Sequence, residues 1–146
     1  MSRSGYTDDW DLADNRLYLY RGAVESALRG RRGQAFLREM LAALDALPEK
    51  RLIQNMLVED GAVCALGAVG RARGLDMKPF APVDDDDYDN DDDMGDAMAG
   101  LFGIARSMAA EIMYENDEGT WAQETPEQRF ARMRRWVERQ IIEWST

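Results

Sequence analysis

No histidine occurs in this sequence of 146 residues. Imidazole is the usual general acid and base at neutral pH, the usual partner of a serine or cysteine nucleophile, and a common zinc ligand. Its absence excludes His-based acid–base catalysis, Ser-His and Cys-His nucleophilic systems, and ordinary zinc centres. A phosphate-cradling loop is missing as well, because Gly30–Gly33 lacks the Lys-Ser/Thr pair of a P-loop.

Cysteine and long apolar runs are scarce too. Cys64 is the single cysteine, so an intramolecular disulfide cannot form. No apolar run approaches the ~20 residues that a membrane-spanning helix needs. Residues Met1–Tyr6 contain no apolar segment of the signal-peptide kind. We therefore expect a soluble, cytoplasmic protein.

Basic residues are outnumbered, with 18 Lys and Arg against 28 Asp and Glu and a net charge of −10. Nine of the acids fall between residues 84 and 96 with no base among them, which leaves 19 acids against 18 bases elsewhere. A charge this negative opposes binding to nucleic acid and to anionic membranes. The expected partners are cations or proteins with a basic surface, and whether the chain forms a homo-oligomer stays open.

Helical periodicity recurs through the chain, and 45% of the residues are apolar. The predicted fold class is all-α, a compact bundle of five or six helices with an acidic loop between its two halves. It forms a single helical domain over residues 1–146, with a polar N-terminal arm (1–13), a helical half (16–74), a Pro- and Asp-rich connector (75–95) and a second helical half (96–146).

Two amphipathic helices are predicted before residue 50. The first runs from about Arg16 to Arg29, and the second runs from Gln34 to Leu47, where Pro48 stops it. The Gly30–Gly33 stretch between them predicts a tight turn. We therefore expect these two helices to form an antiparallel hairpin.

Residues 49–58 favour a short helix over a strand. The next helix is expected from Ala62 to Arg73, capped by Asp60, with Gly74 as its natural end. Its glycines, Gly67 and Gly70, allow a neighbouring backbone to approach closely.

The clearest helix of the chain is predicted from Asp96 to about Tyr114. A last helix begins at Thr125–Gln128, because Thr-Pro-Glu-Gln is a capping box with proline at the first helical position. Its outer faces are expected to carry five arginines: Arg129, Arg132, Arg134, Arg135 and Arg139.

The acidic run is the main candidate site, and its sequence allows several interpretations. It can be a solvated loop, a device that docks on the arginines of the last helix, or a recognition surface whose field attracts a basic protein and imitates a nucleic-acid backbone. The partner-binding residues would be Asp84, Asp85, Asp86, Asp87, Asp89, Asp91, Asp92, Asp93 and Asp96.

A calcium loop is the alternative for the same stretch. The spacing of a twelve-residue loop is met by Asp85, Asp87, Asp89, Asp91, Asp93 and Asp96. Against it, the sixth position is Asn90 rather than glycine, and the last position is aspartate rather than glutamate. Two prolines, Pro79 and Pro82, also oppose an entering helix.

An enzyme is the third interpretation. The carboxylates Glu111, Asp117 and Glu118 cluster with Tyr114 near one helix end, and two carboxylates can serve as acid and base. No nucleophile or oxyanion hole accompanies them. The arginine face of the last helix can bind phosphate, but a solvated face with arginine stems covering apolar surface is favoured.

Several stretches, Arg31–Leu41, Leu44–Ile53, Cys64–Gly74 and Tyr114–Glu118, resemble small proteins encoded by bacteriophages and prophages. The likeness skips the acidic run. It implies a context rather than an activity, because small acidic phage proteins often bind and block a host protein, frequently one that handles nucleic acid. The sequence as a whole favours a non-catalytic protein-binding module, possessing no cofactor, over a calcium-binding protein or a small carboxylate-based hydrolase.

Overall fold

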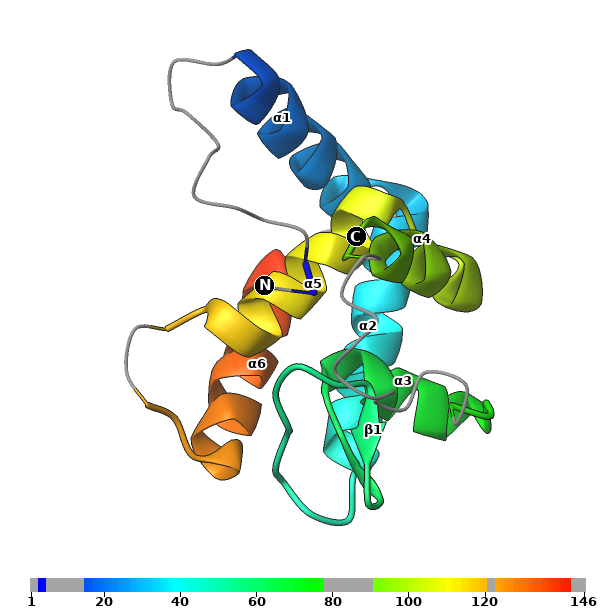
Figure 1. The fold of residues 1–146 in the computed structure, drawn as a ribbon, viewed down its shortest axis with the longest axis vertical. Coiled ribbons are helices and arrows are strands. Elements are labelled where there is room, and N and C mark those ends of the chain that lie inside the picture. The colour runs from blue at the N-terminus through cyan, green and yellow to red at the C-terminus, as the bar shows by residue number, and fades with distance from the viewer. Residues whose placement is uncertain (1–2, 5–14, 78–90, 121–122, 143–146) are drawn as a thin grey trace.

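The computed structural model describes residues 3–4, 15–77, 91–120 and 123–142, with only the backbone at 15–18 and 91–93 (Figure 1). Helices dominate these residues, which confirms the predicted all-α class. The elements in chain order are α1 (Asn15–Arg29), α2 (Arg31–Ala46), β1 (Val58–Glu59), β2 (Ala62–Val63), α3 (Ala65–Arg73), α4 (Asp91–Phe102), α5 (Arg106–Glu118) and α6 (Pro126–Gln140).

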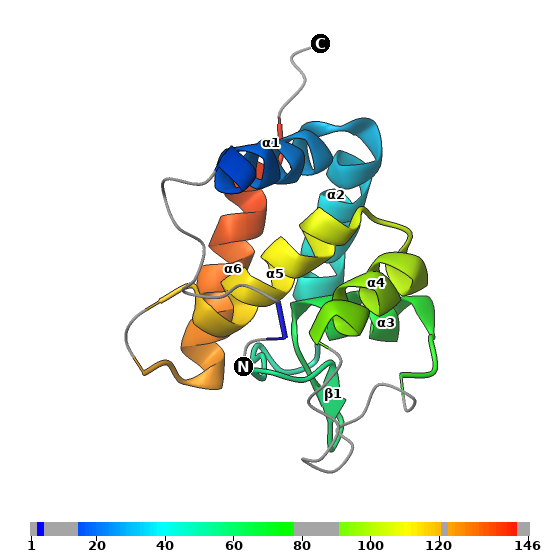
Figure 2. The same ribbon diagram turned by 45° about the horizontal axis from the view of Figure 1, so that its top comes forward.

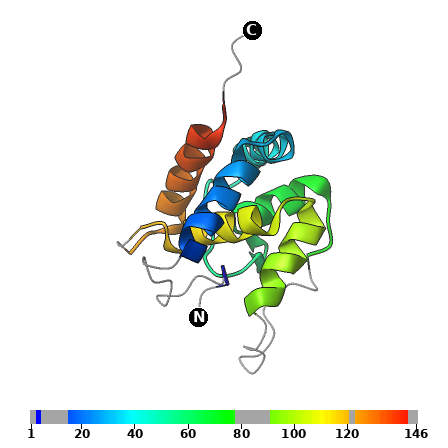
Figure 3. The same cartoon turned by 90° about the horizontal axis from the view of Figure 1, so that it is seen from above.

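A continuous apolar core joins the helices on both sides of the acidic run. Helix α2 packs against α1, α3 and α6, while α5 packs against α1, α3, α4 and α6. Figure 3 shows α5 crossing the molecule between α1 and α4. The side chains that are most completely buried include Leu37, Met40, Leu44, Leu66, Ile112 and Met133.

Helices α1 and α2 are separated by Gly30 alone, so the predicted turn at Gly30–Gly33 is wrong. Gly30 adopts an extended conformation (φ −67°, ψ 164°), and α2 begins at the next residue. The two helices meet at a corner and then diverge, rather than lying side by side as the predicted hairpin requires (Figures 1 and 2). Buried Gln34 braces this corner by donating to the Leu28 and Gln140 carbonyls at 2.8 and 2.9 Å.

The helix predicted over residues 49–58 is also wrong. This stretch is irregular up to Leu57 and ends in β1, which pairs antiparallel with β2. Asp60 and Gly61 form the turn with positive φ angles of 50° and 84°. Asp-Gly between two strands is a strong signal for a hairpin of this kind, and it explains why the chain reverses here instead of starting a helix.

Helix α3 therefore starts later than predicted and is capped by Cys64 rather than by Asp60. The Cys64 Sγ accepts a hydrogen bond from the Gly67 backbone N–H. At Gly67 the Leu57 backbone lies so close that a Cβ would overlap its carbonyl oxygen, which confirms the predicted close approach of a backbone there. At Gly70 the close neighbour is the Met77 side chain instead of a backbone. Gly74 ends the helix in the left-handed conformation (φ 72°), as predicted.

The long helix predicted from Asp96 to Tyr114 is in fact two helices, α4 and α5. Gly103 has a φ of 70°, a conformation that glycine adopts without a steric penalty, and it ends α4. The Gly103 and Ile104 N–H groups both donate to the Ala99 carbonyl, at 2.9 and 3.1 Å. Buried Ile104 and Phe102 keep the connection packed against the core.

The predicted start of the last helix is confirmed. Thr125 accepts from the Gln128 N–H while the Gln128 side chain accepts from the Thr125 N–H, and Pro126 occupies the first turn. None of the helices in the described part of the chain is long and apolar enough to cross a bilayer.

Candidate functional site

Helix α5 carries three of the buried polar and charged residues in the described part of the chain. Glu111, Asn116 and Asp117 on this helix are each at most 8% exposed. Five described parts of the chain meet them: Arg3, α1, the loop between α2 and β1, the start of α3, and α6.

Asp117 is held by four hydrogen bonds to its carboxylate. Arg3 donates from Nε to Oδ2 at 2.6 Å and from Nη2 to Oδ1 at 3.0 Å. The Asn55 N–H and the Asn116 Nδ2 each donate to Oδ1 at 2.9 Å. Both partners of the ion pair are buried, with side-chain exposures of 9% for Arg3 and 2% for Asp117.

The Arg3 guanidinium also reaches Cys64, with its Nη1 lying 3.7 Å from Sγ. Burial alone lowers the pKa of Arg3, but the interactions with Cys64 and Asp117 outweigh it and raise the pKa above its usual value. The guanidinium therefore stays charged inside the fold, and Arg3 connects α5 to the residue that caps α3.

Asn116 links α5 to two other elements. Its Oδ1 accepts from the Ala65 N–H at 3.1 Å, which satisfies a backbone donor in the first turn of α3. Its Nδ2 donates to the Ile53 carbonyl at 3.0 Å. Side-chain hydrogen bonds of Asn116 therefore hold the irregular loop between α2 and β1 against α5.

Arg132 caps the end of α5 from α6. It donates to the Glu115 and Asn116 carbonyls at 2.6 and 3.1 Å, in the last turn of the helix, where carbonyls lack the full set of helical partners. It also forms a two-pronged ion pair with Glu124 at 2.6 and 3.0 Å. Gly119 leaves room for it, because a Cβ at that position would overlap Arg132 Nη1.

Arg129 lies behind Arg132 and is 6% exposed. It donates to the Leu52 carbonyl at 3.1 Å, and its Nε lies 3.6 Å from Glu124 Oε1 with no hydrogen-bond partner of its own. Burial lowers the pKa of Arg129, against the attraction of Glu124. The expectation that all five arginines of the last helix face outward is therefore wrong for Arg129 and Arg132.

The other three arginines of α6 are more accessible. Arg134 forms a two-pronged ion pair with Asp45 of α2, at 2.7 and 3.1 Å. Arg135 and Arg139 are exposed. The basic face of α6 that could bind phosphate therefore lacks Arg129 and Arg132, and its exposed arginines are Arg135 and Arg139.

The carboxylates proposed as an acid–base group do not converge on one site. Glu111 pairs with Arg21 of α1, whereas Asp117 pairs with Arg3. Six residues along a helix separate them by ~9 Å and place them on different faces. Glu118 is exposed, and Tyr114 is partly buried.

Glu115 follows Glu111 by one turn of α5 and lies beside Arg132. Burial raises the pKa of Glu115, while Arg132, whose Nη1 lies 3.3 Å from its Oε1, opposes the increase. The Glu115 carboxylate thus helps to hold Arg132 in place at the end of α5.

The predicted acidic site falls mainly outside the described residues. Asp84, Asp85, Asp86, Asp87 and Asp89 lie there, and so do the calcium-loop positions among them. Asp91, Asp92 and Asp93 form the start of α4, where only the backbone is described. Asp96 is 68% exposed and pairs with Arg106 at 2.9 Å.

Among the residues that the structure describes, no three acidic or cysteine side chains are grouped closely enough to hold a metal ion. A calcium ion bound by Asp96 would have to displace Arg106 from its carboxylate. The calcium loop stays a prediction, because Asp96 is the one of its six acids whose side chain the structure describes.

Comparisons with protein-family models, with curated proteins and with solved structures give no significant match.

Proposed function

We propose that this is a non-catalytic protein-binding module that presents the carboxylates of Asp84–Asp96 to a basic surface on another protein. The resemblance to small phage proteins extends the proposal: the partner is a host protein that handles nucleic acid, and binding blocks it. The acidic segment would then stand in for the phosphate backbone that this partner normally binds.

The supporting observation is the distribution of ion pairs. The arginines of the described core are largely neutralised by nearby acids, in the pairs Arg3–Asp117, Arg21–Glu111, Arg73–Glu39, Arg129–Glu124, Arg132–Glu124 and Arg134–Asp45. Asp96 is the one acid of residues 84–96 whose side chain the structure describes, and it pairs with Arg106. The nine acids of this stretch have no base among them, whereas the rest of the chain has 19 acids against 18 bases. The negative charge of the protein is therefore concentrated at one place in the chain.

Concentrated charge acts at a distance. A field from several carboxylates in one segment attracts a basic protein before contact and accelerates association, and salt screens it over ~10 Å at 0.1 M. An inhibitor that competes with nucleic acid benefits from this, since its target already carries a complementary basic surface. Binding should consequently weaken as the ionic strength rises.

The non-catalytic part of the proposal is supported by the use of the buried carboxylates. Asp117 accepts four hydrogen bonds, and Glu111 is committed to Arg21. A general acid or base needs an oxygen within reach of a substrate proton. These groups instead hold α5 to its neighbours.

The test replaces Asp84–Asp93 with a Ser/Gly segment of equal length and compares pull-downs from a bacterial host lysate, read by mass spectrometry. The control changes three exposed acids elsewhere to glutamine: Glu25, Glu59 and Glu127. We expect the replacement to lose a basic partner that the wild type and the control retain, while the circular dichroism spectrum stays helical. An unchanged set of partners at low salt would refute the recognition role.

A further inference from the structure

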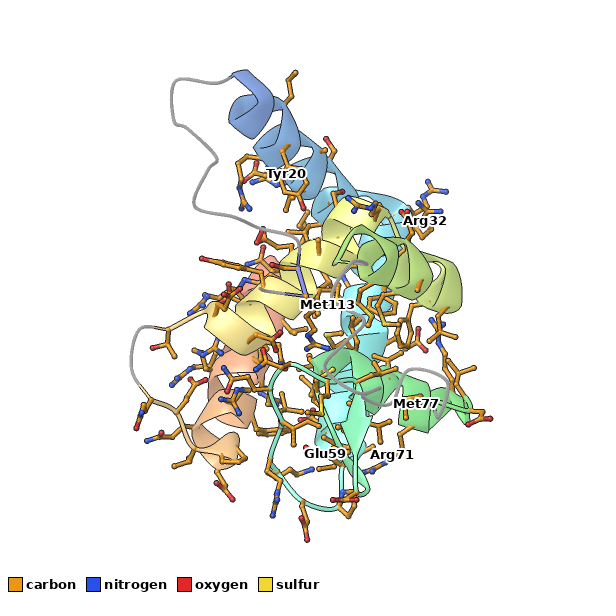
Figure 4. All side chains as sticks on the ribbon, viewed as in Figure 1. Tyr20, Arg32, Glu59, Arg71, Met77 and Met113 are labelled. Atoms are coloured by element: carbon orange, nitrogen blue, oxygen red, sulfur yellow. The ribbon has the colours of Figure 1, made fainter. Side chains whose placement is uncertain are left out.

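The corner between α1 and α2 interrupts what is otherwise one helical stretch from Asn15 to Ala46. The only residue outside both helices is Gly30, whose ψ of 164° turns the chain. In Figure 1, α1 and α2 run in different directions from this corner, and in Figure 4 Arg32 points outward beside it. A change at one residue would convert the two helices into a single straight one.

The corner is compact because it contains glycine at a second position. At Gly33 a Cβ would overlap the Ala27 carbonyl oxygen and lie 2.9 Å from its carbon. At Gly30 a Cβ would lie 3.2 Å from the Ser26 carbonyl oxygen. In a continuous helix these positions carry no such restriction, and glycine there is unfavourable relative to alanine. The two glycines therefore favour the bent form and oppose the straight one.

Two described arginines before the corner pair with acids of α5. Arg3 pairs with Asp117 and Arg21 pairs with Glu111, and both acids belong to that helix. On α1, Val24 is fully buried and Leu28 is 7% exposed within the core. The surface of α5 that binds α1 therefore consists of acidic and apolar groups, and a second copy of the chain offers the same surface.

We propose that α1 can exchange between two copies of this chain. Gly30 becomes helical, residues 15–46 form one helix, and each α1 docks on α5 of the partner copy with the same Arg21–Glu111 pair. Such an exchange reuses existing contacts, and only the single residue between the two helices has to change its conformation. The inference is independent of the acidic segment and of the proposed function.

The first experiment replaces the two glycines, with Gly30→Ala and Gly33→Ala made separately and together, to favour the continuous helix over the bent one. Gly22→Ala is the matched control, because it lies in α1 where a Cβ meets nothing within 4 Å. For Gly30→Ala we expect a rise of about thirtyfold in the dimerisation constant, equivalent to about 2 kcal/mol summed over two chains. Light scattering after size-exclusion chromatography measures the mass, following refolding at high protein concentration. Gly33→Ala should also dimerise, while Gly22→Ala keeps the oligomeric state of the wild type.

The second experiment shows whether a dimer is exchanged. Arg21→Glu and Glu111→Arg each place like charges at the α1–α5 contact when the segment docks within its own copy. Mixed and refolded together on the Gly30→Ala background, the two variants regain an opposite-charge pair at both contacts of an exchanged heterodimer. We expect a 1:1 heterodimer that melts higher than either variant alone.

Two results would overturn the proposal. One is that the glycine variants stay folded and monomeric at every concentration. The other is that the charge-reversed pair shows no gain on mixing, which assigns any dimer to a different surface. If a glycine variant fails to fold, the mixing experiment is repeated on the wild-type background, and its result decides.

Discussion

Replacing Arg3 with methionine should destabilise the protein far more than its place near the chain end suggests. Methionine keeps much of the apolar stem but removes the guanidinium that donates twice to Asp117. The Asp117 side chain is 2% exposed, so its charge would remain buried without a cationic partner. The measured loss of stability therefore reports the contribution of the ion pair and not a loss of packing.

The expected magnitude follows from burial. Removing one partner of a buried ion pair typically costs about 3–5 kcal/mol. A domain of this size is commonly stable by about 5–15 kcal/mol, so the loss is a large part of the total. At roughly 2–4 °C per kcal/mol for a chain of this length, the melting temperature should fall by about 6–20 °C.

Urea unfolding followed by circular dichroism measures the effect, with Arg106→Met as the control. The Arg106–Asp96 pair is largely exposed, at 44% and 68%, so its loss should change the unfolding free energy by less than about 1 kcal/mol. Adding Asp117→Asn to Arg3→Met should recover part of the loss, because it removes the unpaired charge. An Arg3→Met variant within about 1 kcal/mol of the wild type would refute the reasoning.

Three further predictions concern the cap of α5, acid stability and calcium. Gly119→Ala should lower the unfolding free energy by about 1–3 kcal/mol, because its Cβ displaces Arg132, while Gly100→Ala, in open space, should not; urea titration decides between them. Hydrogen bonds from their arginine partners lower the pKa values of Glu39 and Asp45 in the folded protein, from 4.5 and 3.8 in the unfolded chain. The two ion pairs therefore stabilise the fold fully above these unfolded values, and this stabilisation is lost as the pH falls below them. Unfolding measured from pH 6 to 3 should show the destabilisation by Glu39→Gln shrinking towards low pH, and a constant difference would contradict this. Millimolar calcium should leave the melting temperature where a chelator leaves it, whereas an increase would revive the calcium loop, since a ligand of the native state stabilises it.

The helical content was predictable because apolar periodicity is a local property of the sequence. The cap at Thr125 and the stop at Gly74 follow from the chemistry of single residues, and both are confirmed. The errors lie where one residue changes the chain direction. Gly103 breaks a helix despite an uninterrupted apolar stripe, because its positive φ depends on how the two resulting helices pack. The Asp60-Gly61 turn carried a usable signal for a hairpin that the sequence interpretation missed.

The polar junction at the end of α5 was only partly predictable. Asp117 and Glu111 stood out as acids near a helix end, but their partners Arg3 and Arg21 are 114 and 90 residues away in the chain. No spacing rule connects residues at such separations. Arg132 resembled a surface residue because polar and charged groups normally occupy the outer face of an amphipathic helix, whereas here it caps another helix.

The central claim is that the acidic segment recognises a basic partner through its charge. The most direct measurement is the association rate of the captured partner, followed by surface plasmon resonance from low to high salt, for the wild type and for the Ser/Gly replacement of Asp84–Asp93. The account predicts a rate that is high for the wild type at low salt, falls steeply with ionic strength, and is slow and nearly independent of salt for the replacement. Equal rates and equal salt dependence for the two proteins would contradict it.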